Sequence, residues 1–169
     1  MPKPATSDYN PFYGTYIKLV PQNDALSAIL ANTPEIVSFF EQIPADKLDY
    51  AYAPGKWTVK QVLQHITDAE RIFAYRALRI ARADKTPLAS FEENDYAEQA
   101  RVDGLDWIDM IAEFKAVRSS TEYLFKSLNE TELQRTGTAS NSPITVNSLG
   151  FITAGHALHH RQVLIERYF

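Results

Sequence analysis

The sequence contains no cysteine, and this absence limits the chemistry available to the chain. The chain can form no disulfide, offers no thiolate nucleophile and cannot build a zinc site of the cysteine type. Any metal ion must therefore be held by nitrogen and oxygen ligands.

Long apolar runs and an excess of positive charge are also missing. No stretch approaches 18 uninterrupted apolar residues, and the first residues lack the apolar run of a secretory signal. The formal net charge is -4, and no basic domain is present that could neutralise many phosphates. We therefore expect a cytoplasmic protein that binds neither a membrane nor a nucleic acid.

The composition that remains is that of an ordinary globular protein. Hydrophobic residues make up 45% and charged residues 22% of a 169-residue chain, a length typical of one domain. We expect a single domain over residues 1–169. Residues 1–23 contain four of the nine prolines and several aromatic residues, which predicts an extended N-terminal arm that packs by its rings.

Apolar residues with helical spacing predict four helices and hence an all-α four-helix bundle. The predicted helices span about 24–42, 58–83, 105–129, and from Thr145 or Asn147 to near Phe169. Pro34 predicts a bend near Thr33 in the first helix. The second helix is the best defined, because Thr58 and Gln61 form a capping-box pattern at its start.

Two polar segments connect these helices. Residues 84–103 form a long connection between the second and third helices, and long connections in compact domains tend to be functional or to cross a bundle end. The segment 129–142 is polar and rich in turn residues. We see no convincing alternating strand in the chain.

All four histidines lie on two of the predicted helices, His65 on the second and His156, His159 and His160 on the fourth. Around a helix, His156 and His160 differ by about 40°, and His156 and His159 by about 60° in the other sense. A helical histidine pair with a third histidine from a neighbouring helix is a pattern of metal sites with an open position.

We therefore predict one divalent metal ion held by His65, His156 and His160. His159 is predicted to line the pocket, or else to replace one of the pair. Two alternatives need no metal: the histidines form a polar face favoured by the helix dipole, or a polar cluster in the core.

Asp68 is the candidate catalytic residue, because it follows His65 by three residues and lies on nearly the same face. It could orient a histidine, act as a base or become a fourth ligand. The alternative is an ordinary surface aspartate. Glu70 and Arg71 are predicted to point elsewhere and to form surface ion pairs.

Four arginines crowd the second half of the same helix, at positions 71, 76, 79 and 82. Charge balance with acidic neighbours and with the helix dipole is the simpler interpretation. The alternative is that an arginine near the metal binds the carboxylate of an acidic substrate.

The two histidine stretches carry a family resemblance. Residues 53–73, Ala-Pro-Gly-Lys-Trp-Thr-Val-Lys-Gln-Val-Leu-Gln-His-Ile-Thr-Asp-Ala-Glu-Arg-Ile-Phe, and the later Gly155-His-Ala-Leu-His-His resemble the DinB-like (DinB/YfiT-like) superfamily of metal-dependent proteins. The resemblance covers nearly the whole chain. It implies a four-helix bundle, often a homodimer, with a divalent metal on three histidines that match His65, His156 and His160. Members include thiol S-transferases that use bacillithiol or mycothiol and a mycothiol-dependent isomerase, and many have no established activity.

Two functions follow as expectations. The first is a metal-dependent enzyme acting on a small molecule, either a hydrolase that activates water or an S-transferase that activates a low-molecular-weight thiol. Because the chain has no cysteine, such a thiol comes from a cosubstrate. The second is a non-catalytic, dimeric metal-binding protein of a stress response. Zinc and nickel are the first candidates for the metal, followed by iron, cobalt and manganese.

Overall fold

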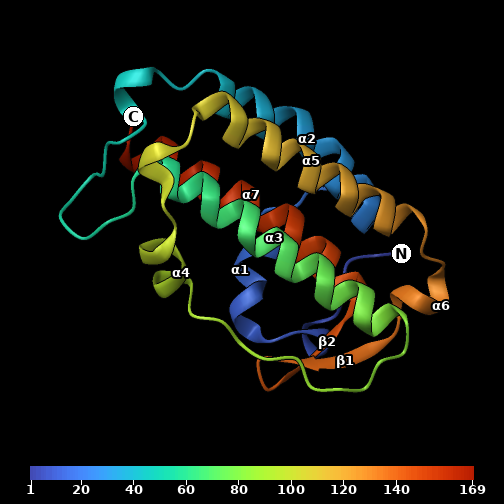
Figure 1. Ribbon diagram of the computed structural model, residues 1–169. Coiled ribbons are helices and arrows are strands. Elements are labelled where there is room, and N and C mark those ends of the chain that lie inside the picture. Colours follow the sequence, from blue (N-terminus) through green and yellow to red (C-terminus); the bar gives the residue numbers. More distant parts are fainter.

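Four long helices form the body of the structure, a computed structural model that describes residues 1–169 (Figure 1). They are α2 (Ala25–Glu41), α3 (Val59–Ala81), α5 (Trp107–Lys126) and α7 (Val146–Arg167). Each begins and ends within a few residues of a predicted helix. The prediction of an all-α four-helix bundle is confirmed.

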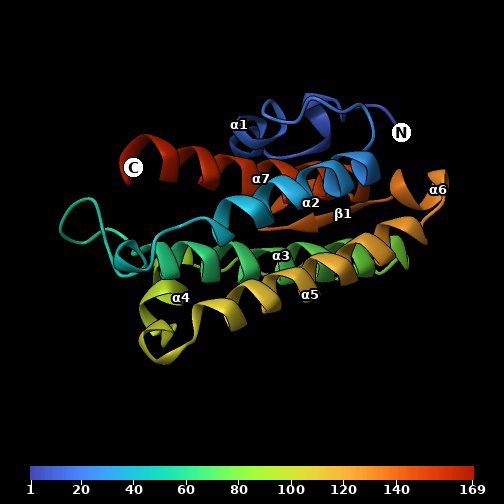
Figure 2. The ribbon, with the colours of Figure 1, turned by 90° about the horizontal axis from the view of Figure 1, so that it is seen from above.

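The four helices close into a bundle because α2 and α3 each pack against both α5 and α7. In Figure 1, α3 and α7 run side by side through the middle of the molecule. Figure 2 shows the bundle from above, with the N-terminal arm lying over α7 on the side away from α5. The contact between α3 and α7 brings together the two helices that carry the histidines. No helix is long and apolar enough to cross a membrane.

The predicted helix starts are confirmed in detail. At α3, the Gln61 N–H donates to Thr58 Oγ1 at 3.2 Å, and the Thr58 N–H donates to Gln61 Oε1 at 2.9 Å. Thr145 caps α7 by accepting from the Ser148 N–H at 3.1 Å. α2 continues through Pro34, and the bend near Thr33 stays a prediction.

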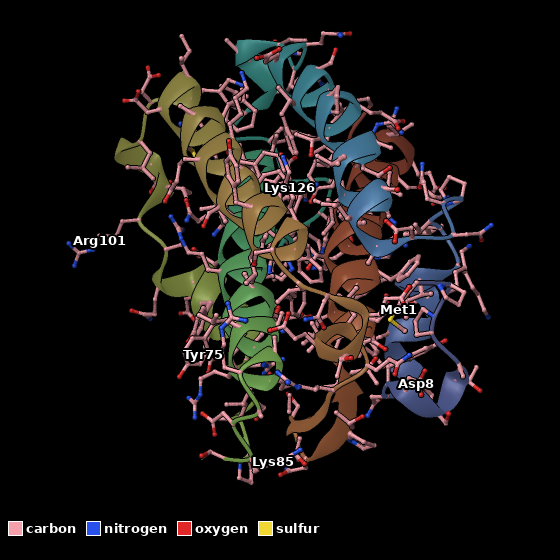
Figure 3. The ribbon with its side chains drawn as sticks, turned by 90° about the vertical axis from the view of Figure 1, so that its right-hand side faces the viewer. Met1, Asp8, Tyr75, Lys85, Arg101 and Lys126 are labelled. Atoms are coloured by element: carbon pink, nitrogen blue, oxygen red, sulfur yellow. The ribbon has the colours of Figure 1, made fainter.

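The N-terminal arm differs from the extended segment that the prolines predict. It contains the short helical turns η1 (Thr6–Asp8), η2 (Pro11–Tyr13) and α1 (Gly14–Ile17). α1 packs against α7, and Figure 3 shows Met1 and Asp8 of the arm on the outer side of the bundle. The arm therefore places aromatic side chains on α7 from a short helix instead of from an extended segment.

The connections between the long helices contain the remaining elements. These are η3 (Ala45–Lys47), α4 (Glu93–Gln99), η4 (Val102–Gly104) and α6 (Glu130–Leu133). α4 lies within the long connection 84–103 and packs against α3. The connection therefore returns along the bundle beside the helix that carries His65.

A small β-hairpin corrects the expectation of no strands. Strands β1 (Thr136–Ala139) and β2 (Ser142–Thr145) pair antiparallel. Ser140 and Asn141 make the tight turn with φ values of 51° and 59°, a left-handed conformation that short polar residues tolerate. The hairpin leads directly into α7 and fixes where this helix starts.

Two apolar clusters fill the interior, and a layer of buried polar side chains separates them along the helices. On α5, Phe114 belongs to one cluster and Phe125 to the other, with Arg118 between them. On α7, Ala154 and Ala157 flank His156 in the same way. We call this the polar layer: Asn32, His65, Glu70, Arg118 and His156.

The predicted surface ion pair of Glu70 is wrong, because Glu70 lies in the polar layer and is 2% exposed. Its carboxylate accepts hydrogen bonds from Arg118 Nε at 2.9 and 3.0 Å and from Nη2 at 2.8 Å. Arg71, one residue later and rotated by about 100°, does lie on the surface, where it pairs with Asp68 and Glu113.

Candidate metal centre

The structure brings three histidine side chains to one point inside the bundle. His65 Nε2 lies 3.0 Å from His156 Nε2, and His160 Nε2 lies 3.1 Å from the same atom. These are the three histidines named from the sequence, and they form the one group of histidine and acidic side chains with metal-ligand spacing in the structure. Their nitrogens, one from α3 and two from α7, face one another.

Regular helical geometry accounts for this convergence. His156 and His160 are one turn apart on α7, so their rings lie on one face and meet edge to face, with centroids 4.5 Å apart and an interplanar angle of 77°. His65 reaches the same place from α3, which lies beside α7. The Trp57 ring packs 4.6 Å from the His65 ring and holds it from the end of the bundle.

Burial keeps these imidazoles neutral. The pKa of His65 is lowered to about 4, first by burial and then by the charge of His159. Burial, followed by the neighbouring histidines, also lowers the pKa values of His156 and His160 well below the ordinary value. Neutral imidazole is the form that binds metal ions.

The donor set fits a divalent cation. His156 Nε2 lies about 3 Å from the Nε2 atoms of both His65 and His160. In a neutral imidazole this nitrogen carries either one proton or one lone pair, so it cannot form good hydrogen bonds with both neighbours at once. A cation among the three nitrogens accepts all three lone pairs at once. The three side chains that would hold it are His65, His156 and His160.

His159 lies outside this cluster. Its ring packs 5.1 Å from the Tyr16 ring and 5.1 Å from the His160 ring, and it is only partly buried. It lines a cavity beside His160. His156 and His160 are therefore the pair that α7 contributes to the cluster, and a functional role of His159 in the pocket stays a prediction.

Asp68 lies one turn after His65 but makes its contacts elsewhere. Its carboxylate accepts hydrogen bonds from Gln64 Nε2 at 3.0 Å and from Arg71 Nη1 at 3.1 Å, and from no histidine. It lines neither of the cavities beside the cluster. The catalytic role predicted for Asp68 stays a prediction.

A cavity of about 160 Å³ opens against His65 and His156. Its other walls are mostly aromatic side chains of the arm, of α3 and of the long connection: Phe12, Tyr13, Tyr16, Phe73 and Phe91. The Glu93 carboxylate and the Ser140 hydroxyl add polar groups. We call this the aromatic cavity.

Two polar groups in the aromatic cavity have perturbed pKa values. Burial and the charge of Glu92 raise the pKa of Glu93, although its side chain keeps contact with solvent. Burial, followed by the charge of Glu93, raises the pKa of Tyr16 to about 12. Tyr16 therefore keeps its proton at neutral pH, and Glu93 is a stronger base than an ordinary glutamate.

A second cavity of about 230 Å³ lies against His159 and His160. Its walls include Trp57, Lys56 and Asn94. We call this the lysine cavity. Glu93 and Asn94 are consecutive residues at the start of α4, so this short helix contributes to both cavities.

Sequence reasoning did not identify Glu93 and Tyr16. Neither lies on a long helix with apolar periodicity, and their approach to the histidines depends on how the arm and the connection 84–103 fold back onto the bundle. The length of this connection was the one available signal.

We expect the metal-free protein to lose stability as the pH falls from about 6.5 towards 4. In this range the unfolded chain protonates His65 and the folded protein does not, so the free energy of unfolding decreases with falling pH. A pKa shift of His65 from the ordinary value of 6.5 to about 4 amounts to roughly 3 kcal/mol of unfolding free energy once the pH lies below both values. Urea unfolding of chelator-treated protein between pH 7.5 and 4.5 measures this.

The matched comparison is His65→Phe, which should show a shallower pH dependence than the unmodified protein. His159→Phe removes a partly exposed histidine and should change the slope less. Equal slopes for the unmodified protein and His65→Phe would show that His65 is not kept neutral by burial.

Comparison with known proteins gives relatives of the same kind. The model of the DinB superfamily matches residues 28–164. A protein of Oceanobacillus iheyensis named "putative metal-dependent hydrolase" is 28% identical over 117 residues, 68% of this chain and 67% of that protein. A protein of the same name from Geobacillus thermodenitrificans is 27% identical over 119 residues, 68% of this chain and 66% of its own length.

Solved structures share the fold. YfiT from Bacillus subtilis, described as "a probable metal-dependent hydrolase with an unusual four-helix bundle topology", superposes with a TM-score of 0.71 at 21% identity, over 97% of this chain and 90% of YfiT. A mycothiol-dependent maleylpyruvate isomerase superposes with a TM-score of 0.66 at 10% identity, over 82% of this chain and 58% of its own. Since the family model spans most of the chain and both histidine stretches, the chain belongs to the DinB superfamily.

Proposed function

We propose that His65, His156 and His160 hold one divalent metal ion, and that the protein is a metal-dependent hydrolase acting on a small molecule in the aromatic cavity. The observation that carries this proposal is that His65 and His156 of the cluster also form a wall of that cavity. A purely structural metal site would be closed on all sides. Zinc and nickel are the first candidates for the ion, and iron, cobalt and manganese are further ones.

The residues of the aromatic cavity supply the other parts of a hydrolytic reaction. A divalent ion held by the three imidazoles would lower the pKa of a water molecule and so supply a nucleophile near neutral pH. Glu93, whose pKa is raised, would act as the general base. The protonated Tyr16 hydroxyl is available to donate a hydrogen bond to the substrate, and the aromatic rings offer contacts for its apolar part.

The lysine cavity favours a second candidate, the transfer of a low-molecular-weight thiol. It lies against His160, and Lys56 provides a positive charge for the carboxylate of such a thiol. Asn94 offers polar contacts for a sugar or peptide part. With an electrophile in the aromatic cavity and a thiol in the lysine cavity, the two reactants approach the histidines from different sides.

Turnover assays separate the two candidates. We expect metal-reconstituted protein to cleave activated aryl esters or amides without any thiol, and chelation to abolish the activity. Conjugation of an aryl electrophile that requires both metal and a thiol, with no cleavage in its absence, would replace the hydrolase by the S-transferase. Absence of both activities in metal-loaded protein would favour the non-catalytic alternative.

Two carboxamide variants test which carboxylate acts as the base. Glu93→Gln should lower kcat by about 10²–10⁴ with unchanged metal content. Asp68→Asn is the matched control, because its carboxylate already bonds to Gln64 and Arg71. A larger loss for Asp68→Asn than for Glu93→Gln would return the base role to Asp68, as the sequence predicted.

A further inference from the structure

Arg76 of α3 is a buried cation without a carboxylate partner. Its side chain is 2% exposed. Nη2 donates to the Ala89 carbonyl oxygen at 2.7 Å and to Ser140 Oγ at 3.1 Å, both uncharged groups. Its guanidinium carbon lies 5.9 Å from the centre of the Phe91 ring. Nε and Nη1 have no hydrogen-bond partner in the protein and are not among the fully buried unpartnered atoms. A buried charge is normally balanced by an opposite charge, and Arg76 has no negatively charged partner in the protein.

The neighbouring arginines show the usual arrangement. Arg79 pairs with Asp84, Arg82 pairs with Glu132, and Arg118 pairs with Glu70. Arg82 has a half-exposed side chain, yet it has a carboxylate partner. The charge balance that explains the other arginines of α3 therefore does not explain Arg76.

Arg76 lines a cavity of about 340 Å³ between α3 and the connection that follows it. Arg79 and the hydroxyl residues Thr86 and Ser90 also line it, and no aspartate or glutamate does. Tyr75, Phe91 and Tyr96 give it aromatic walls. Tyr75, labelled in Figure 3, lies on the outer side of α3 near the end that leads to Lys85.

We propose that this cavity is a binding site for a small organic carboxylate with an apolar or aromatic body. Its single negative charge would balance the single unpaired charge of Arg76, since Arg79 already has Asp84. The free guanidinium N–H groups suit the two oxygens of a carboxylate, and the aromatic walls suit the body of the ligand. A phosphate monoester brings nearly two charges and fits this balance less well.

The site is distinct from the histidine cluster but adjoins it. Phe91 lines both this cavity and the aromatic cavity, and Ser140, which accepts from Arg76, lines the aromatic cavity. A carboxylate bound at Arg76 would therefore lie behind one wall of the aromatic cavity. The proposal does not depend on the metal, because none of its residues belongs to the cluster.

Titration of ¹⁵N-labelled, chelator-treated protein with benzoate tests the proposal. Metal is removed so that benzoate cannot bind at a metal ion on the histidines. A negative result in this titration would therefore not count against the proposed metal site. We expect the Arg76 Nε–H signal, assigned with Arg76→Lys, to shift saturably with benzoate. Benzamide, which has the same shape but no charge, should bind at least about tenfold more weakly.

Variants complete the test. Arg76→Gln should weaken benzoate binding about tenfold or more, whereas Arg82→Gln, which changes an arginine outside the cavity, should leave it unchanged. If Arg76→Gln does not fold, the response of the Arg76 Nε–H signal to benzoate in the unmodified protein still tests the proposal. An Arg76 signal that does not move, or equal affinity for benzoate and benzamide, would overturn the proposal and leave Arg76 as a clamp between α3, Ala89 and Ser140.

Discussion

Replacement of Glu70 by alanine is expected to lower the free energy of unfolding by about 3–5 kcal/mol, because it leaves a buried guanidinium without its counter-charge. The Arg118 side chain is 0% exposed, and Glu70 supplies every hydrogen-bond acceptor that it has. The remaining nitrogen, Nη1, is buried without a partner even in the intact protein. Urea unfolding followed by circular dichroism measures the loss.

The matched control is Glu113→Ala, which breaks an ion pair of the same type on the surface. Glu113 accepts from Arg71 at 2.6 Å, but the two side chains are 36% and 45% exposed, and we expect a change of about 1 kcal/mol or less. Glu70→Leu combined with Arg118→Leu should recover much of the stability lost in Glu70→Ala, since no charge then stays buried. Equal losses for Glu70→Ala and Glu113→Ala would mean that burial does not strengthen the pair.

Replacement of Gly155 by alanine is expected to detach the N-terminal arm from α7. A Cβ at this position would lie 2.2 Å from the Tyr16 carbonyl oxygen and 2.5 Å from its carbonyl carbon, so the backbone of the arm would have to move. Tyr16, whose ring lies 5.3 Å from the His156 ring, would move with it. We expect a loss of about 1–3 kcal/mol in stability and faster proteolysis within residues 1–20.

Gly104→Ala is the control for this variant, because a Cβ at Gly104 would meet nothing within 4 Å. It should leave both the proteolysis of the arm and the stability almost unchanged. If Gly155→Ala is cleaved no faster than Gly104→Ala, the close approach of the arm to α7 does not hold it in place.

The fold was predictable from the sequence because the long helices carry two independent signals. Apolar residues recur with helical spacing, and Thr58 and Thr145 mark the starts of the two histidine helices as N-caps. The hairpin escaped detection because its strands are short, contain Pro143, and depend on the Ser140–Asn141 turn. Leu88 adds a further bridge to Ala139 that no local pattern indicates.

The buried ion pair shows a limit of reasoning from residue type. Glu70 follows the buried Ile66 by four residues and precedes the buried Phe73 by three, so helical spacing places it on the apolar face. Because glutamate is charged, the sequence nevertheless led to the prediction that Glu70 lies on the surface. Only the position of Arg118 on a different helix explains how a carboxylate can lie there.

Some residues of the candidate site could be predicted from the sequence and others could not. Helical spacing on α7 places His156 and His160 on one face, and this follows from the sequence pattern. The contact between α3 and α7, which adds His65, is a tertiary feature that the sequence indicated only through the histidines themselves. Glu93 and Tyr16 reach the cavity from segments without a periodic pattern. Their positions depend on tertiary contacts such as the close approach of the arm to Gly155.

The metal content of the reconstituted protein, measured beside His65→Ala and His159→Ala, tests the central claim most directly. We expect one divalent ion per chain in the unmodified protein and in His159→Ala, since His159 lies outside the cluster. His65→Ala should retain almost none after dialysis, because the two histidines of α7 would remain without the ligand from α3. Stoichiometric metal in His65→Ala, with correctly folded protein by circular dichroism, would contradict the three-histidine site.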